Sequence, residues 1–94
     1  MAHIFEIIDK SKRRIYLSDE RLKHIKRDHP DVEKEEIKLT LQEPVKIIDK
    51  RKNKNFYYGY FKYKKLPSKF LRVIVNYLNG EGFVISAYFV KRIN

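Results

Sequence analysis

Residues 70–90, FLRVIVNYLNGEGFVISAYFV, decide the fold of this chain. Along 70–78 every odd-numbered residue is Leu, Val or Tyr, and this period of two is typical of a β-strand. Arg72, Ile74 and Asn76 are then expected on the opposite face. Asn79-Gly80 favours a tight turn, because both residue types tolerate positive φ angles. The stretch therefore predicts two antiparallel strands, with 70–78 at the centre of a sheet.

The strand predicted over 83–90 brings two polar side chains to one face. The period of two places Val84, Ser86 and Tyr88 together, and the odd-numbered residues from 85 to 89 on the other face. A hydroxyl and a phenol two residues apart can orient a phosphate or donate a proton, although the same pair is common on a solvated strand face. Arg72, on the preceding strand, faces either solvent or a phosphate.

Four further segments have strand character, namely HIFEIID (3–9), RIYL (14–17), VKIID (45–49) and FYYGYFKY (56–63). Gly59 interrupts the aromatic segment, which indicates a bulge or a close approach of the backbone. Two helices precede the last four strands, and short loops join those strands. The expected fold class is therefore α+β, with two N-terminal helices packed on a four-stranded antiparallel β-sheet meander, in a single domain over 1–94.

The two helices have recognisable ends. Ser18 is a suitable N-cap for the first helix, and Pro30 disfavours helical geometry at His29, so the helix should end there. Asp31 is expected to cap a second helix, DVEKEEIKLTLQ (31–42). The apolar stripe of this second helix consists of Val32, Ile37 and Leu41.

Charge is the strongest feature of the composition. The 94 residues carry a formal net charge of +10, and there is no cysteine, which excludes disulfides and cysteine metal ligands. Residues 18–43 hold six basic and eight acidic side chains, whereas 44–72 hold ten basic and one acidic. This basic half predicts a polyanionic partner, most simply nucleic acid, although lysine-rich surfaces also serve solubility. With no signal peptide and no apolar run near the roughly 20 residues that span a membrane, we expect a cytoplasmic protein with no membrane partner.

The stretch HIKRDHP (24–30) holds two of the three histidines. On a continuous helix His24 and His29 would lie about 140° apart, so they converge only if the chain bends at His29. Such a pair is a natural acid/base set, and in a basic domain it fits metal-independent RNA cleavage, in which the 2′-OH attacks the adjacent phosphate. Alternatively, His24 is a surface residue and His29 packs on the sheet. The spacing does not match zinc-binding helices, so we expect neither a metal nor another cofactor.

Aromatic and cationic residues are interleaved after residue 49. Aromatic rings among cations suit single-stranded RNA, because bases stack and phosphates are neutralised, but tyrosine is also favoured in strands for its own sake. The residues expected to bind nucleic acid are Lys50, Arg51, Lys54, Tyr58, Tyr60, Lys62 and Lys64.

The order of several segments resembles the small phage- and toxin-associated nuclease domains of the barnase–EndoU–colicin–RelE-like superfamily. The resemblance covers about residues 16–92 and rests on SDERLKHIKRDHPD, LQEPVKII, the tyrosine-rich strand and LRVIVNYLNGEGFVISAYF. These are similar to an H-x4-HP[ED] helix motif and a closing V-x-V…NG…[FV]-I-[TS]-A-Y strand pair. One departure is Asp28, which stands where a basic residue is commoner and could pair with His29.

The resemblance implies helices over a four-stranded antiparallel sheet and a metal-independent ribonuclease, often a toxin effector. In that family pattern His24 and His29 would be the acid/base pair, Ser86 and Tyr88 would be the hydroxyl and aromatic residues of the closing strand, and Arg72 would be the phosphate cation. RNA is the expected partner, together with an acidic antitoxin or immunity protein that could dock on an edge strand such as 45–49. The alternative is a basic domain that binds nucleic acid without cutting it.

Overall fold

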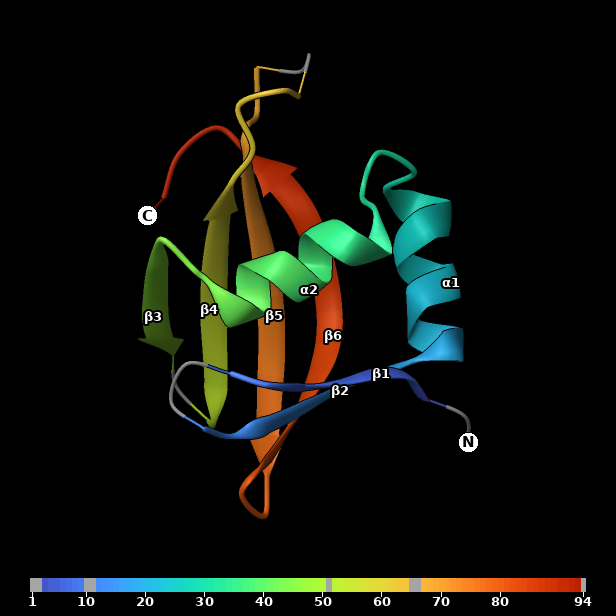
Figure 1. Ribbon diagram of the computed structural model, residues 1–94, viewed down its shortest axis with the longest axis vertical. Helices are drawn as coiled ribbons and strands as arrows, with labels where there is room; N and C mark the ends of the chain where they lie inside the picture. The colour runs from blue at the N-terminus through green and yellow to red at the C-terminus, as the bar shows by residue number, and fades with distance from the viewer. Residues whose placement is uncertain (1–2, 10–11, 51, 65–66, 94) are drawn as a thin grey trace.

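A computed structural model describes residues 3–9, 12–50, 52–64 and 67–93 of the chain. In chain order its elements are β1 (His3–Ile8), β2 (Arg14–Ser18), α1 (Asp19–Asp28), α2 (Lys34–Gln42), β3 (Lys46–Lys50), β4 (Lys54–Tyr60), β5 (Phe70–Leu78) and β6 (Glu81–Val90). The predicted α+β class is confirmed (Figure 1). Among these described residues, neither helix is long and apolar enough to cross a membrane.

The described strands form one mixed sheet in the order β1-β2-β6-β5-β4-β3. The last four strands are the predicted antiparallel meander, but the prediction of a four-stranded sheet is wrong. The β1–β2 hairpin joins the sheet through a short parallel pairing of β2 with β6, at Ile15 with Gly82 and Tyr16 with Phe83. Figure 1 shows this hairpin running across the lower part of the other strands.

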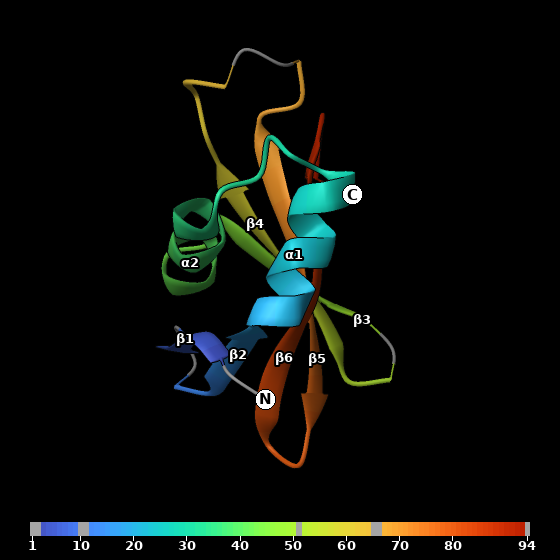
Figure 2. The ribbon, with the colours of Figure 1, turned by 90° about the vertical axis from the view of Figure 1, so that its right-hand side faces the viewer.

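The two helices take different places around the sheet. Helix α2 covers β4 and β5 on one face, while α1 lies beside β6 (Figures 1 and 2). The close approach predicted at Gly59 is confirmed, because a Cβ there would overlap the Thr40 hydroxyl of α2. We call the side of β3–β6 opposite α2 the open face. The chain that follows β6 turns back on that side, near the adjacent ends of β4 and β5 (Figures 1 and 2).

Helix α1 begins and ends as predicted. The Ser18 hydroxyl caps it by accepting a hydrogen bond from the Arg21 backbone N–H at 3.2 Å. Its C-cap is His29, whose backbone N–H donates to the Ile25 carbonyl at 2.7 Å. Pro30 prevents a further helical turn. Lys26 then ties the following loop to the helix, since its ammonium donates to two loop carbonyls and to Glu33.

Helix α2 begins later than predicted, so the proposed Asp31 cap is wrong. The N-cap is Glu33, which forms a capping box with Glu36: the Glu33 backbone N–H donates to Glu36 Oε1 at 2.9 Å, and the Glu33 side chain accepts in return. This reciprocal pair satisfies two helix-end donors that an Asp31 cap would leave free. The predicted apolar stripe is buried, with Val32, Ile37 and Leu41 all at 0% exposure.

The central strands sort their side chains between a buried face and the open face. On β5 the odd-numbered residues are buried against the helices and Arg72, Ile74 and Asn76 lie opposite them, as predicted. On β6 the register shifts, because Ile74 pairs with Ser86 whereas Val75 pairs with Val84. Ile85 is thus one extra residue, a β-bulge that exchanges the faces of all residues after it.

The bulge corrects the faces expected for β6. Val84 lies on the buried face with Ala87, and both are almost fully buried. Ser86 and Tyr88 instead share the open face with their partners Ile74 and Arg72. The prediction that Val84 shares a face with Ser86 and Tyr88 is therefore wrong, since strict alternation does not allow for an inserted residue.

Candidate functional site

A pocket lies between α1 and β6. Helix α1 and its C-cap contribute five lining residues and the β6 bulge contributes two, namely Arg21, His24, Ile25, Asp28, His29, Ile85 and Ser86. Ile25 belongs to the hydrophobic core, so it anchors the helix while the polar side chains remain at the surface. Basic and hydroxyl groups thus converge at one place from segments about 60 residues apart in the sequence.

The two histidines come together in this pocket. His29 leaves helical geometry, with φ −136° and ψ 74°, and the bend brings it to the same pocket as His24. The sequence predicted that the two histidines converge only if the chain bends at His29, and the structure contains this bend. His24 is exposed and its Nδ1 lies 3.0 Å from Arg27 Nη2, whereas His29 is half-buried.

His29 connects the pocket to a row of polar side chains on the open face. Its ring lies 5.5 Å from the Tyr88 ring. Arg72 Nη1 donates to the Tyr88 hydroxyl at 3.0 Å, and Arg72 Nε donates to the Tyr58 hydroxyl at 2.9 Å. Strand pairing aligns Tyr58, Arg72 and Tyr88 directly across three strands, so this order follows from the sheet register.

Two phenols hold the Arg72 guanidinium in one orientation. Burial disfavours its charge, but the hydrogen bonds with Tyr88 and Tyr58 outweigh that effect and raise the pKa of Arg72 above its usual value. Its central carbon also lies 5.4 Å from the centre of each phenol ring. Arg72 is therefore a fixed positive charge beside Tyr88, which still has its own hydroxyl hydrogen to donate.

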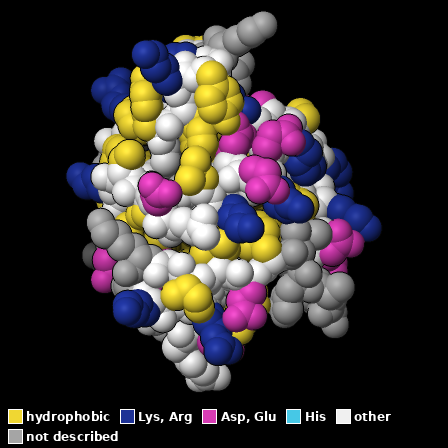
Figure 3. All heavy atoms as spheres, in the orientation of Figure 1, with side chains coloured by type: hydrophobic (Ala, Val, Ile, Leu, Met, Phe, Trp, Pro, Cys, Tyr) yellow, Lys and Arg dark blue, Asp and Glu magenta, His cyan; other side chains and the backbone are white. Residues whose placement is uncertain are grey.

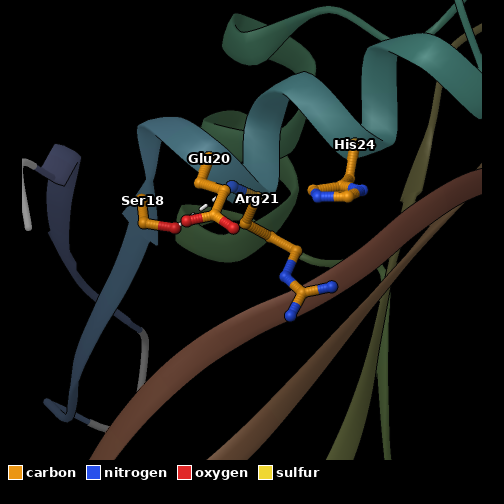
Figure 4. Close-up of a pocket in the computed structure, with 4 residues that line it drawn as sticks. All are labelled: Ser18, Glu20, Arg21 and His24. Carbon is orange, nitrogen blue, oxygen red and sulfur yellow. Dashed lines mark hydrogen bonds between the residues drawn. The ribbon is translucent and has the colours of Figure 1, made fainter.

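Arg21 also lines the pocket, although it is not among the residues predicted from the sequence. Figure 4 shows the side chains of Arg21 and His24 extending from α1 toward β6. With Ser18 and Glu20 they also line an adjoining pocket at the N-terminal end of the helix. The spacing of three between Arg21 and His24 places them on one helix face, and this signal could have identified Arg21.

Three of the seven residues expected to bind nucleic acid are exposed on the open face. Lys50 and Lys54 are paired at the β3–β4 turn, and the Lys50 ammonium lies 5.1 Å from the Phe56 ring. Tyr60 is exposed and contacts the Phe70 ring at 5.1 Å. Lys62 is also exposed, just beyond β4. Arg51 lies outside the described residues.

Tyr58 and Lys64 make contacts within the fold. Tyr58 is fully buried, and its hydroxyl accepts the hydrogen bond from Arg72. The Lys64 ammonium lies 3.0 Å from Glu36 Oε2 and donates to the Asp31 carbonyl, so it fastens the β4–β5 loop to the start of α2. Both side chains therefore have a structural role in the fold.

The acidic residues around the pocket do not form a metal site. In the described ranges, no group of three or more His, Asp or Glu side chains is placed to hold a metal ion. The Asp28 carboxylate lies 3.5 Å from Arg27 Nε, and the described residues show no ion pair between Asp28 and His29.

Comparison with known proteins found no similar protein. No family model, no curated protein and no solved structure matches this chain.

Proposed function

We propose that this chain is a metal-independent endoribonuclease that cleaves RNA by general acid/base catalysis. The observation that carries the proposal is the convergence of His24, His29 and Ser86 on one pocket, with the fixed charge of Arg72 reached through Tyr88. The resemblance of the motif order to toxin-associated nucleases supports the same reading. Lack of cysteine suits a reducing compartment, and the proposed substrate is cytoplasmic RNA.

The pocket offers a distinct role to each histidine. Arginine nitrogens only donate hydrogen bonds, so His24 Nδ1 accepts from Arg27 and holds an electron pair that can take a proton. In the proposed reaction the 2′-OH of RNA replaces Arg27 there, and His24 removes its proton. The 2′ oxygen then bonds to phosphorus, the bond from phosphorus to the 5′ oxygen breaks, and protonated His29 supplies a proton to that leaving oxygen. The products are a 2′,3′-cyclic phosphate and a free 5′-OH.

Cations and hydroxyls stabilise the negative charge that develops on the phosphate. Arg72 is held by Tyr58 and Tyr88 before any substrate arrives, so it needs little reorganisation during the reaction. Arg21 and Ser86 line the same pocket as the histidines and can donate to the phosphate oxygens. In the proposed reaction Arg72, Arg21 and Ser86 act from the positions that they hold in the folded chain.

A second candidate function is binding of nucleic acid without cleavage. It is favoured by Lys50, Lys54 and Phe56, which lie on the open face away from the histidine pocket. Both functions share the cations and rings, and only the histidines distinguish them.

An acidic protein partner, such as an antitoxin or immunity protein, fits the edge of the sheet. In the described sheet β3 is the last strand, with exposed Lys46 and Lys50. An edge strand presents unpaired backbone groups to an incoming strand, and the lysines would favour an acidic one.

The experiment is cleavage of a mixed single-stranded RNA pool by purified protein in excess chelator. We expect the wild type to leave 2′,3′-cyclic phosphate ends, and His24→Ala and His29→Ala to lose about a hundredfold or more in rate. Lys23→Ala, an exposed change elsewhere on α1, is the control and should cut normally. Wild-type rates in both histidine variants would exclude the mechanism. RNA retention without cleavage would support the binding function instead.

A further inference from the structure

Rows of open-face side chains lead away from the histidine pocket. Strand pairing forms one row from Ser86, Ile74, Phe56 and Ile48, and a second row from Tyr88, Arg72, Tyr58 and Lys46. Neighbouring strands lie about 4.8 Å apart, so each row runs about 14 Å from β6 to β3. A few nucleotides beyond the one in the pocket can lie along this distance.

The part of the open face on β3–β5 is basic. It carries Lys46, Lys50, Lys54 and Arg72. Asp49 is the single acidic residue of these three described strands, and its pairing with the buried Asn55 places it on the other face. On the face that carries α2, by contrast, acidic side chains lie among the basic ones (Figure 3).

Phe56 provides a stacking surface in the middle of this basic region. Its ring is half-buried, with the Lys50 ammonium 5.1 Å and the Arg72 guanidinium carbon 5.3 Å from its centre. An aromatic face between two cations suits a single-stranded base whose flanking phosphates need neutralising.

The opposite end of the sheet, at β1 and β2, is unfavourable for a polyanion. Glu81 Oε2 accepts a hydrogen bond from the Tyr16 hydroxyl at 2.8 Å, and the Tyr16 ring stacks on Phe83. Glu6 pairs with Tyr16 across the strands and lies 3.6 Å from Arg14 Nε, so the Arg14 guanidinium is already matched by a carboxylate. Two carboxylates therefore border the open face on this side.

We propose that the open face of β3–β5 is a one-sided binding track for single-stranded RNA. The strand leaves the pocket only toward β3, across Arg72, Phe56 and the β3 lysines, and makes no favourable contact toward β1. This inference rests on the proposed ribonuclease function for the position of the cleaved bond, while the track itself is a separate property of the sheet.

The test uses oligonucleotides that contain one ribonucleotide, so that cleavage occurs at one bond. Three deoxynucleotides are added on the 5′ side only, on the 3′ side only, or on both. We expect one of the single-sided extensions to raise kcat/KM about fivefold or more, and the other to leave it unchanged. Equal gains from both sides would overturn the one-sided track, and so would no gain from either.

A lysine pair provides the matched variant. Lys46→Ala/Lys50→Ala should abolish the gain from the favourable extension, measured as the ratio of kcat/KM for the extended substrate to kcat/KM for the shortest one. Lys34→Ala/Lys38→Ala removes two lysines from α2, on the opposite face, and should keep the gain. A gain that survives the β3 changes would overturn the assignment of the track to this face.

A binding measurement separates failure of the track from failure of the proposed function. If the wild type cuts none of these substrates, the ribonuclease proposal fails, and fluorescence anisotropy with an all-deoxy oligonucleotide tests the track. The plot of log K against log salt should flatten by about 0.7 for each lysine contact removed. The same slope in the β3 variant and the wild type would overturn the track.

Discussion

Replacing Tyr58 by phenylalanine tests whether the two phenols hold Arg72 in place. Tyr58 is fully buried and its hydroxyl accepts from Arg72 Nε at 2.9 Å. Phenylalanine fills the same space, so the change removes one hydrogen bond to a charged group, a loss of about 1.5–3 kcal/mol. Arg72 is partly exposed and water can replace part of the loss, so we expect about 1.5 kcal/mol. This corresponds to a fall in Tm of roughly 6–12 °C for a domain of this size.

The same change should lower the rate of RNA cleavage. If Arg72 stabilises the transition state from the position that Tyr58 sets, a loss of about 1.4 kcal/mol lowers kcat about tenfold. Urea unfolding gives the stability and single-turnover cleavage of a one-ribonucleotide substrate gives the rate. Tyr60→Phe alters an exposed phenol on the same strand and should stay within about 0.5 kcal/mol of the wild type. A Tyr58→Phe protein as stable and as active as this control would refute the reasoning.

Three further changes test the fold around the site. Gly59→Ala should lower the free energy of unfolding by about 1–3 kcal/mol, because the added Cβ overlaps the Thr40 hydroxyl. Thr40→Ala in the same chain should recover part of that stability in thermal unfolding, and purely additive losses would contradict the contact. Burial, followed by the hydrogen bond to Asp9, raises the pKa of Tyr57, so the stability of the fold should decrease as the pH rises past about 10. Tyr57→Phe should reduce this decrease, measured by urea unfolding between about pH 9 and about pH 11. Parallel stability curves for the variant and the wild type would contradict the prediction. Ser18→Ala removes the α1 N-cap and should lower stability by about 1 kcal/mol in thermal melts, whereas an unchanged Tm would show that the cap contributes nothing.

Local chemistry made several features predictable from the sequence. The alternation in β5 predicted the open-face position of Arg72 because one face of that strand is buried throughout. Ser18 and Pro30 predicted both ends of α1, since capping and proline sterics act within a few residues. The bend at His29 followed from the same local rule, and it is what brings the two histidines to one pocket.

Other features depend on contacts that leave no local pattern. The parallel pairing of β2 with β6 joins residues far apart in the sequence, so the sheet was predicted with too few strands. The excess of lysine identified a basic half, but it could not show that the Lys64 ammonium is bound to Glu36 while the Lys50 ammonium lies over a ring on the open face. Counting charges predicts only the charge of a partner, and the packed chain is needed to show which lysines are exposed and which are held in ion pairs.

The bulge at Ile85 determines which side chains of the closing strand lie on the open face. If Ile85 were kept and paired in regular register, Ser86 and Tyr88 would move to the buried side and Ala87 and Phe89 would turn outward, because strand faces alternate strictly in the absence of a bulge. Deleting Ile85 would instead leave Ser86 and Tyr88 on the open face, since Val84 and Ser86 would then be consecutive residues of a regular strand. A change of side chain at position 85 that keeps the bulge would likewise leave the two faces of the strand unchanged. Among homologous chains, both substitution and loss of the bulge residue should therefore be compatible with the hydroxyl and the phenol on the open face, whereas a deletion of the one residue between Ser86 and Tyr88 would place these two side chains on opposite faces.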